Sequence, residues 1–409
     1  MTQNKRKGGI TPMTKIIKPK KPKLEVADIL RLHIADYQKS YCLWPEHKKI
    51  VSDLTRCRTP YLGGHMERCN HCGAKRITYH SCRNRHCPTC QQIPRERWLE
   101  ARKKELLPTT YFHVVFTLPH ELNPIILSNK SVMFNCLFKA VSKSLLKFGK
   151  NELGGKLGFI LVLHTWDQLL KDHFHLHCLV AGGAVSADQN RWIPCKDYLF
   201  NQDALSLVFR GKFMDLMTRA CRCGKLKFNG QYQPLKNKLY TKKWVVSVRD
   251  PIRRAHHVLE YIARYTHRVA IANSRLLCLS DGRVTFRYKD RKNNTFEKTT
   301  ITAVEFIRRF LLHALPRGFV RIRHYGFLAN KNRKINLSRI RRLLKLPPQS
   351  DQINASVEEM MLKLTGTDIT LCPCCNKGKM SLFKEIPKLG GNHPKNSIRP
   401  PNYQMVASG

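Results

Sequence analysis

Residues 171–183 read KDHFHLHCLVAGG, in which His173, His175 and His177 occupy alternate positions. A period of two is that of a β-strand, so the three imidazoles share one face of the strand. The residues facing the opposite, apolar layer are Phe174, Leu176, Cys178 and Val180. The chain must therefore contain a sheet with one apolar face, and we expect Gly182 and Gly183 to end this strand.

A lone histidine on such a face is most simply a solvated polar residue. Three imidazoles spaced two residues apart on a rigid strand instead suit a divalent metal or a phosphate, the ligands to which histidine is best adapted near neutral pH. The pattern therefore predicts a metal or phosphate site on one face of the sheet.

The charge of the chain points to a polyanionic partner. Of 409 residues, 42% are apolar, which agrees with a folded protein of two or three domains. Lysine and arginine number 74 against 28 acidic residues, a formal charge of +46 that attracts phosphate backbones. A ribosomal or membrane-surface role is the simpler alternative. No apolar run reaches the roughly 18 residues that span a bilayer and no signal peptide is evident, so we expect a cytoplasmic protein without a membrane partner.

Sixteen cysteines in a reducing compartment are better explained as metal ligands than as disulfides. The stretch CNHCGAKRITYHSCRNRHCPTC contains two C-x-x-C pairs, Cys69 with Cys72 and Cys87 with Cys90. Two such pairs form a tetrahedral thiolate site, so we predict one structural zinc ion held by these four cysteines. Spacing leaves open whether Cys82 or His86 replaces one of them.

Basic residues near these pairs, Lys75, Arg76, Arg83 and Arg85, are expected to face DNA. A third cysteine group, C-P-C-C at 372–375, offers one further pair, Cys372 with Cys375, and leaves Cys374 over. Its spacing does not decide between half of a metal site and none.

The order of predicted elements indicates an α+β fold. Helical periodicity covers 25–40, 95–107, 131–149 and 253–273, and strands are expected at 111–118, 158–166, 173–180, 283–290 and 295–302. We expect a disordered basic arm at 1–24, a helical and zinc-binding domain at 25–105, a second domain at 106–345 and a basic, loosely ordered tail at 346–409.

Two enzyme classes use such a histidine strand. HFHLHCL fits the histidine-triad pattern of nucleotide hydrolases and transferases, in which the middle residue, His175, attacks an α-phosphate. It also contains the His-hydrophobic-His unit with which rolling-circle nucleases hold a metal over a scissile phosphate. Tyr261 and Tyr265, four residues apart on one face of a predicted helix, favour the second class. Such a pair alone would most simply be core or cation-stacking residues.

Taken together, these motifs resemble the two-tyrosine rolling-circle transposases of bacterial insertion sequences, members of the HUH endonuclease superfamily. The resemblance extends from about Cys57 to Asn330. SCRNRHCPTCQ is similar to their zinc-binding module, HFHLHCLV to their metal motif, and YIARYTHRVAIANSRL with FRYKD and RIRHYGFLAN to their tyrosine domain. Phe174 departs from the pattern, because it stands where a proline is expected between the histidines.

The resemblance implies a fold and a chemistry. The fold, expected over residues 106–345, is an HUH/Rep-like antiparallel sheet with flanking helices. In it the tyrosine helix lies beside the metal site. The phenolate of Tyr261 or Tyr265 attacks a DNA phosphodiester, leaving a 5′-phosphotyrosine and a free 3′-hydroxyl, so that single strands are nicked and rejoined during transposition.

The implied metal is magnesium or manganese, held by His175 and His177. The third ligand is open among His173, Gln168 and Asp167. The implied partner is DNA, as single-stranded ends and target, in the nucleoid of a bacterium.

Two further functions remain alternatives. A plasmid replication initiator or relaxase shares the strand-transfer chemistry, and a non-enzymatic zinc DNA-binding protein needs only the first domain and the charge.

Overall fold

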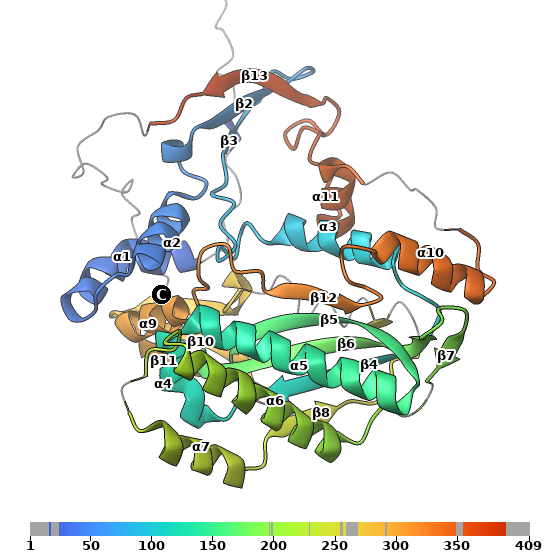
Figure 1. Cartoon of the computed structure of the whole chain (residues 1–409). Coiled ribbons are helices and arrows are strands. Elements are labelled where there is room, and N and C mark those ends of the chain that lie inside the picture. The colour runs from blue at the N-terminus through green and yellow to red at the C-terminus, as the bar shows by residue number, and fades with distance from the viewer. Residues whose placement is uncertain are drawn as a thin grey trace, which may run out of the picture. The chain divides into compact units, whose positions relative to one another are not determined.

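The structure is a computed structural model that describes residues 16–17, 24–195, 197, 199–228, 230–253, 257–258, 269–290, 293–348 and 355–389. These residues fall into two compact units. The described parts of the first unit are 16–17, 51–84 and 355–389, and those of the second are 24–50 and 85–348 with the gaps given above. Figure 1 shows the elements of each.

An antiparallel sheet forms the centre of the second unit (Figure 1). Its strands are β4 (Tyr111–Thr117), β5 (Gly155–Trp166), β6 (Asp172–Ser186), β7 (Trp192–Pro194), β8 (Val245–Val248) and β12 (Ile322–Gly326). They are ordered β12-β5-β6-β4-β8, and β7 pairs with the end of β6. All these pairings are antiparallel, which confirms the expected α+β class.

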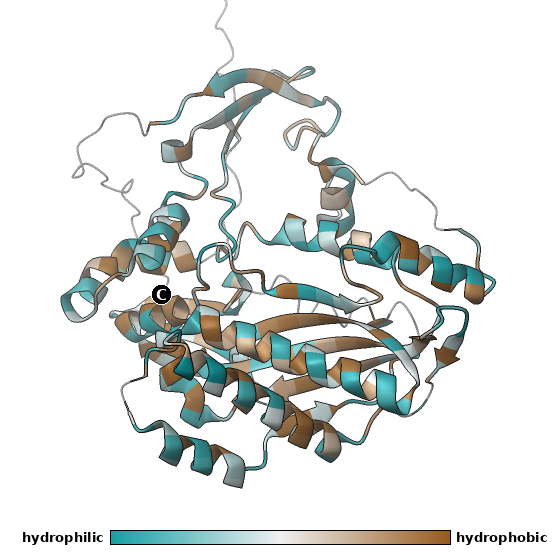
Figure 2. Ribbon diagram, viewed as in Figure 1, coloured by the Kyte–Doolittle hydropathy of each residue, from teal (hydrophilic) through white to brown (hydrophobic). Residues whose placement is uncertain are grey.

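Helices pack on both faces of this sheet. They are α3 (Gln92–Lys103), α4 (Asn123–Ser128), α5 (Lys130–Glu152), α6 (Gln202–Arg222), α7 (Tyr232–Thr241) and α10 (Arg333–Leu343). On one face α5 and α6 bury a phenylalanine-rich core that includes Phe134 and Phe209. On the other face, Leu99 of α3 and Ile340 of α10 pack with Val258. Figure 2 shows the strands as predominantly apolar between these helices.

The two faces of β6 differ as its alternation predicts. Phe174, Leu176, Cys178 and Val180 are buried in the core beneath α5 and α6. Leu179 and Ala181 lie in the opposite core. Because side chains alternate along a strand, His175 and His177 share the face of Leu179.

The strand does not end at the two glycines. β6 continues through Gly182 and Gly183 to Ser186, so the prediction that they end it is wrong. A β-carbon on Gly182 would lie 2.6 Å from the carbonyl oxygens of Cys195 and Thr110, and one on Gly183 would lie 2.2 Å from Trp192. These glycines are present because neighbouring groups approach the strand closely, which a side chain would prevent.

A second sheet and its helices complete the second unit. The elements are α1 (Val26–Ser40), α2 (Pro45–Arg56, which runs into the first unit), β9 (Leu276–Ser280), β10 (Arg283–Lys289), β11 (Phe296–Thr302), α9 (Ala303–Leu312) and the short 3-10 turns His120–Leu122 and Asn273–Arg275. β10 pairs antiparallel with β9 and β11, and β10 and β11 are the strands expected at 283–290 and 295–302. α1 packs against α9.

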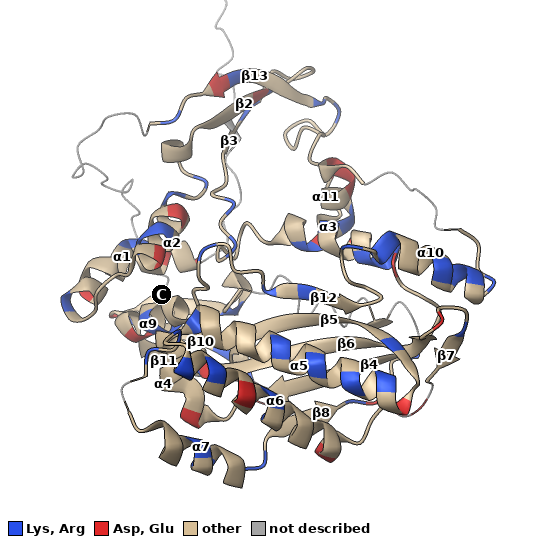
Figure 3. Ribbon diagram, viewed as in Figure 1, with Lys and Arg blue, Asp and Glu red and all other residues tan. Residues whose placement is uncertain are grey.

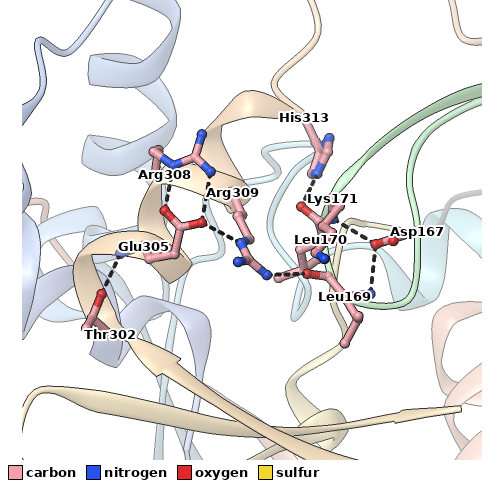
Figure 4. A network of polar contacts seen from close by, with 9 residues as sticks. All are labelled: Asp167, Leu169, Leu170, Lys171, Thr302, Glu305, Arg308, Arg309 and His313. Atoms are coloured by element: carbon pink, nitrogen blue, oxygen red, sulfur yellow. Dashed lines mark hydrogen bonds and ion pairs between the residues drawn. The ribbon is translucent and has the colours of Figure 1, made fainter. Parts of the chain in front are cut away.

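Helix α9 holds the turn that joins β5 to β6 (Figure 4). Its side chain Arg309 donates to the carbonyl of Leu169 at 3.0 Å, and the imidazole of His313 is 3.0 Å from the carbonyl of Leu170. Glu305 accepts hydrogen bonds from Arg309 and Arg308. The turn is thus fixed from outside the hairpin, which sets the register of the two strands.

The first unit contains a four-stranded sheet ordered β1-β3-β2-β13. Its elements are β1 (Ile16–Ile17), the 3-10 turn Pro60–Leu62, β2 (Gly64–Cys69), β3 (Lys75–Tyr79), α11 (Val357–Thr365) and β13 (Met380–Ile386). β2 and β3 form a hairpin, and β13 pairs antiparallel with β2.

This sheet changes the expected domain boundaries. Residues 355–389, predicted to be a loosely ordered tail, form α11 and β13 and join residues 51–84 in one unit. Residues 25–50 and 85–105, predicted to belong to the zinc domain, fall in the second unit. Of the basic arm, Ile16–Ile17 form β1, and its other residues up to Lys23 lie outside the described residues. No described helix has the length and apolar character needed to cross a membrane.

Candidate metal centre and cysteine clusters

Three histidines converge on one face of the central sheet. His164 of β5 lies directly opposite His175 of β6 in the antiparallel register, and His177 follows on the same face. One ring nitrogen from each lies within 4.8 Å of the others, and all three residues are buried. The Nε2 atoms of His175 and His177 are 3.0 Å apart.

Contacts on the far side of two rings fix their orientation. Nδ1 of His175 lies 2.9 Å from the carbonyl oxygen of His173, so it carries the proton and leaves Nε2 with a lone pair. Nδ1 of His177 lies 2.8 Å from Nε2 of His113 on β4, and the two rings are stacked. Outer contacts of this kind are what orient histidines that bind metals.

The donor set fits a divalent cation. Two neighbouring ligands on an octahedral ion with bonds of about 2.1 Å lie about 3.0 Å apart, which is the spacing of the two Nε2 atoms. Burial, and secondarily Arg249, lowers the pKa of His113 to about 3. His113 therefore stays neutral and can accept the proton that a metal-bound His177 carries on Nδ1.

The residues expected to supply a third ligand are placed elsewhere. Asp167 organises the β5–β6 turn, since its Oδ1 accepts from the amides of Leu169 and Lys171 at 2.8 and 2.7 Å. Gln168 lies in the same turn. His173 supplies its carbonyl to His175, and its ring packs beside that residue. The residue that the structure brings to the group is His164.

His164 could have been found in the sequence. A hairpin whose turn is centred between residues 169 and 170 places positions 164 and 175 opposite each other. The strand expected at 158–166 already ended in His-Thr-Trp. His164 becomes a candidate ligand only when the two predicted strands are paired with each other.

The two candidate nucleophiles lie outside the described residues. Tyr261 and Tyr265 belong to the segment 259–268. The described residue that precedes this segment is Val258, which is fully buried in the core on the face of the sheet that carries the histidines.

The predicted pairing of the four zinc cysteines is not what the structure shows. Cys69 and Cys72 lie with Cys372 and Cys375, and one sulfur from each lies within 4.8 Å of the others. The reason is topological, because β13 pairs with β2 and brings the C-P-C-C segment to the β2–β3 turn. The local spacing of the two N-terminal pairs could not reveal this long-range contact.

Four other cysteines, Cys57, Cys82, Cys87 and Cys90, make contacts within their own units. In the first unit, the amide of Cys82 donates to the sulfur of Cys57 at 3.5 Å. In the second, the amide of Cys90 donates to the carbonyl of Cys87 at 3.2 Å, which closes a tight C-x-x-C turn. His86 is partly buried, and desolvation, with smaller effects from nearby cations, lowers its pKa to about 3.

Two of the basic residues expected to face DNA have structural roles. Arg76 pairs with Glu67 at 2.7 Å and donates to the carbonyl of Ile369. Arg85 donates to the carbonyls of Phe319 and Pro316 at 2.6 and 3.0 Å. Figure 3 shows that lysine and arginine are spread over many elements, among them α5 and α10.

Comparison with known proteins agrees with this arrangement. Residues 158–335 match the family described as "Putative transposase", and residues 29–118 match "Transposase zinc-binding domain". "Putative transposase y4qJ" of Sinorhizobium fredii is 42% identical over 87% of this chain and 94% of its own length. "Transposase for insertion sequence element IS801" of Pseudomonas savastanoi pv. phaseolicola is 24% identical over 69% of this chain and 70% of its own.

No solved structure matches the chain significantly. The first family match covers the histidine strands and the segment with both tyrosines, and the second covers six of the cysteines discussed above. The sequence identity, its coverage and both family matches lead to one conclusion: this chain belongs to the insertion-sequence transposases of the IS91 and IS801 type, which carry an N-terminal zinc-binding domain.

Proposed function

We propose that this transposase nicks and rejoins single DNA strands through a 5′-phosphotyrosine intermediate. The observation that carries the proposal is the group His164, His175 and His177, buried on one face of an antiparallel sheet within a chain of +46 formal charge. A histidine-triad hydrolase would need His175 free to attack a phosphate. Its Nε2 instead faces that of His177 at 3.0 Å, as two ligands of one ion do.

In this proposal the three histidines hold magnesium or manganese, with His164 in place of the third ligands expected from the sequence. When bound, the cation polarises a DNA phosphate and stabilises the charge that develops during attack. His113 and the carbonyl of His173 keep the two strand imidazoles in the tautomers that offer Nε2. The substrate in this proposal is DNA.

Tyr261 and Tyr265 are the proposed nucleophiles. The sequence predicts that they lie four residues apart on one face of a helix. Val258, the described residue that precedes them, packs on the histidine face of the sheet. The attacking oxygen forms a bond to phosphorus while the 3′-oxygen of the preceding nucleotide leaves and takes up a proton.

Incubation of the protein with labelled single-stranded DNA and manganese, followed by a denaturing gel, tests the proposed chemistry. We expect a covalent adduct in the wild type and none in Tyr261→Phe/Tyr265→Phe, which keeps both rings but removes both nucleophilic oxygens. Each single variant should retain some nicking and fail in complete transposition. An adduct that persists in the double variant and maps to another residue would exclude both tyrosines.

The histidines are tested in the same assay. We expect His164→Ala, His175→Ala and His177→Ala each to abolish cleavage while DNA binding is largely kept, because phosphate contacts elsewhere supply most of the affinity. Asp167→Ala is the matched control, because Asp167 is one of the third ligands expected from the sequence and His164 is proposed in its place. If His164→Ala cleaved DNA normally, a residue other than His164 would be the third ligand.

A further inference from the structure

Two C-x-x-C turns of the first unit have the same backbone geometry, although 300 residues separate them. We call Cys69–Gly73 the N-knuckle and Cys372–Asn376 the C-knuckle. In each, the amide four residues after the first cysteine donates to the carbonyl of that cysteine, at 3.2 Å in the N-knuckle and 2.9 Å in the C-knuckle. In each, the residue after the second cysteine has a positive φ, +69° for Gly73 and +51° for Asn376. Glycine and asparagine are the residues that adopt this conformation most readily.

Both knuckles also direct amides at their sulfur atoms. The amide two residues after the first cysteine lies 3.4 Å from its sulfur in both, from His71 to Cys69 and from Cys374 to Cys372. The amide of Gly378 donates to the sulfur of Cys375 at 3.4 Å. Hydrogen bonds of this kind favour the ionised thiolate, which is the form that binds metal.

The sulfurs of the two knuckles face one another at metal-site distances. Cys69 lies 3.8 Å from Cys375, and Cys72 lies 3.8 Å from Cys372. This is too long for a disulfide. Four sulfurs at about 2.3 Å from a tetrahedral zinc ion lie about 3.8 Å apart, so the observed spacing is that of a zinc-thiolate centre.

Four thiolates at these separations repel one another, and a bound cation offsets that repulsion.

The backbone around the C-knuckle is fitted to the N-knuckle. A β-carbon on Gly378 would lie 2.5 Å from the sulfur of Cys69, so this position accepts no side chain. Asn70 donates its amide to the carbonyl of Lys379 and accepts the Lys379 amide on its side chain, at 3.1 and 2.8 Å. From Met380 onward, β13 continues this contact along β2.

We propose that the N-knuckle and the C-knuckle together bind one structural zinc ion, so that the C-terminal segment completes a zinc ribbon begun near the N-terminus. The match to the transposase zinc-binding domain ends at residue 118 and does not reach the C-knuckle. The proposal is independent of the strand-transfer chemistry.

The test compares zinc per full-length chain, by mass spectrometry of the metal, in three proteins. We expect Cys372→Ser/Cys375→Ser to contain one zinc ion fewer per chain than the wild type. The matched control is Cys374→Ser, because Cys374 lies between the two ligands, is exposed and is absent from the sulfur group. It should keep the full zinc content. Unchanged zinc in the double variant would overturn the proposal.

A second measurement covers the case in which the double variant does not fold. Cys375→His keeps four ligands but replaces one sulfur with nitrogen, so the cobalt-substituted variant should lose part of the sulfur-to-cobalt charge-transfer absorption. Cys374→His should leave the cobalt spectrum unchanged. If the Cys375→His and wild-type spectra coincide, the C-knuckle does not bind the ion. Neither readout depends on DNA cleavage, so failure of the strand-transfer proposal would be seen separately.

Discussion

His113 contacts the proposed metal-binding histidines from outside the group, so it tests how such a contact affects metal affinity. Its Nε2 is 2.8 Å from Nδ1 of His177, and its ring is stacked on that ring. His113→Phe keeps the buried ring but removes the acceptor, so His177 loses the contact that selects its tautomer. Replacing such outer partners typically lowers metal affinity about 10-fold to 100-fold.

Manganese binding measured by electron paramagnetic resonance checks this expectation. The thermal unfolding of His113→Phe should stay close to that of the wild type, because an aromatic ring still fills the site. Wild-type manganese affinity in this variant would show that His113 does not position His177.

His324 on β12 predicts acid sensitivity of the second unit. Burial, followed by the charges of Arg102 and Arg333, lowers its pKa to about 3, from an ordinary value near 6.5. The unfolded chain therefore binds a proton in this pH window that the folded chain does not. The stability associated with neutral His324 is complete above about pH 6.5 and is lost as pH falls toward 3, by at most about 1.4 kcal/mol per pH unit.

Unfolding of His324→Gln followed from pH 7 to 5 isolates this contribution. The variant should lose less stability over that range than the wild type, since glutamine does not titrate. Parallel pH profiles of the two proteins would contradict the assignment. Zinc release at low pH affects both proteins alike and cancels in the comparison.

At the residue scale, sequence reasoning reached the parts of the site that local periodicity determines. His175 and His177 were placed correctly on one face because a strand alternates. His164 was missed because its role depends on strand pairing, and the partner of Cys69 was missed because it lies 306 residues away. Local patterns carry no information on contacts of that sequence separation.

At the element scale, the effect of replacing a glycine with alanine on stability depends on the atoms that surround the glycine. Gly182→Ala would place a β-carbon 2.6 Å from two backbone oxygens, of Cys195 and Thr110, which directly adjoin β7 and β4. We expect destabilisation of about 1–3 kcal/mol, the range of overpacking a well-filled core. Thermal or denaturant unfolding measures it.

Gly211 in helix α6 provides the matched control. A β-carbon there meets nothing within 4 Å apart from the backbone of its own helix. Gly211→Ala should therefore stabilise the protein by about 0.5–1 kcal/mol, the usual advantage of alanine within a helix. If both substitutions changed stability by the same amount and sign, close approach would not be the reason for Gly182.

The elements themselves followed from the sequence more closely than their assembly did. Periodicity located α1, α5, β4, β5 and the β10–β11 hairpin to within a few residues. The predictions for the end of β6 and for the order of residues 355–389 were wrong, because both depend on partners that are distant in the chain. Trp192 and β7 extend β6, and β2 orders β13.

At the scale of the whole molecule, charge dominates the expected interaction with DNA. The excess of 74 basic over 28 acidic residues is spread over both units, and Figure 3 shows no single element that holds it. Each phosphate that the protein neutralises releases counterions, so the logarithm of affinity for single strands should fall with the logarithm of salt concentration by about 0.7 per contact.

Deletion of residues 1–15 tests the share of the N-terminal arm in this field. It removes four of the 74 basic residues, Lys5, Arg6, Lys7 and Lys15, and leaves β1 in place. We expect the salt slope, measured by fluorescence anisotropy with a labelled oligonucleotide, to become shallower by at most about 2.8, because each lost phosphate contact contributes about 0.7. Nicking should persist, since the histidine group is untouched. The matched control replaces these four residues with glutamine at full length, which removes charge but keeps chain length, and it should reproduce the shallower slope. If affinity did not depend on salt even in the wild type, the basic excess would not serve DNA binding.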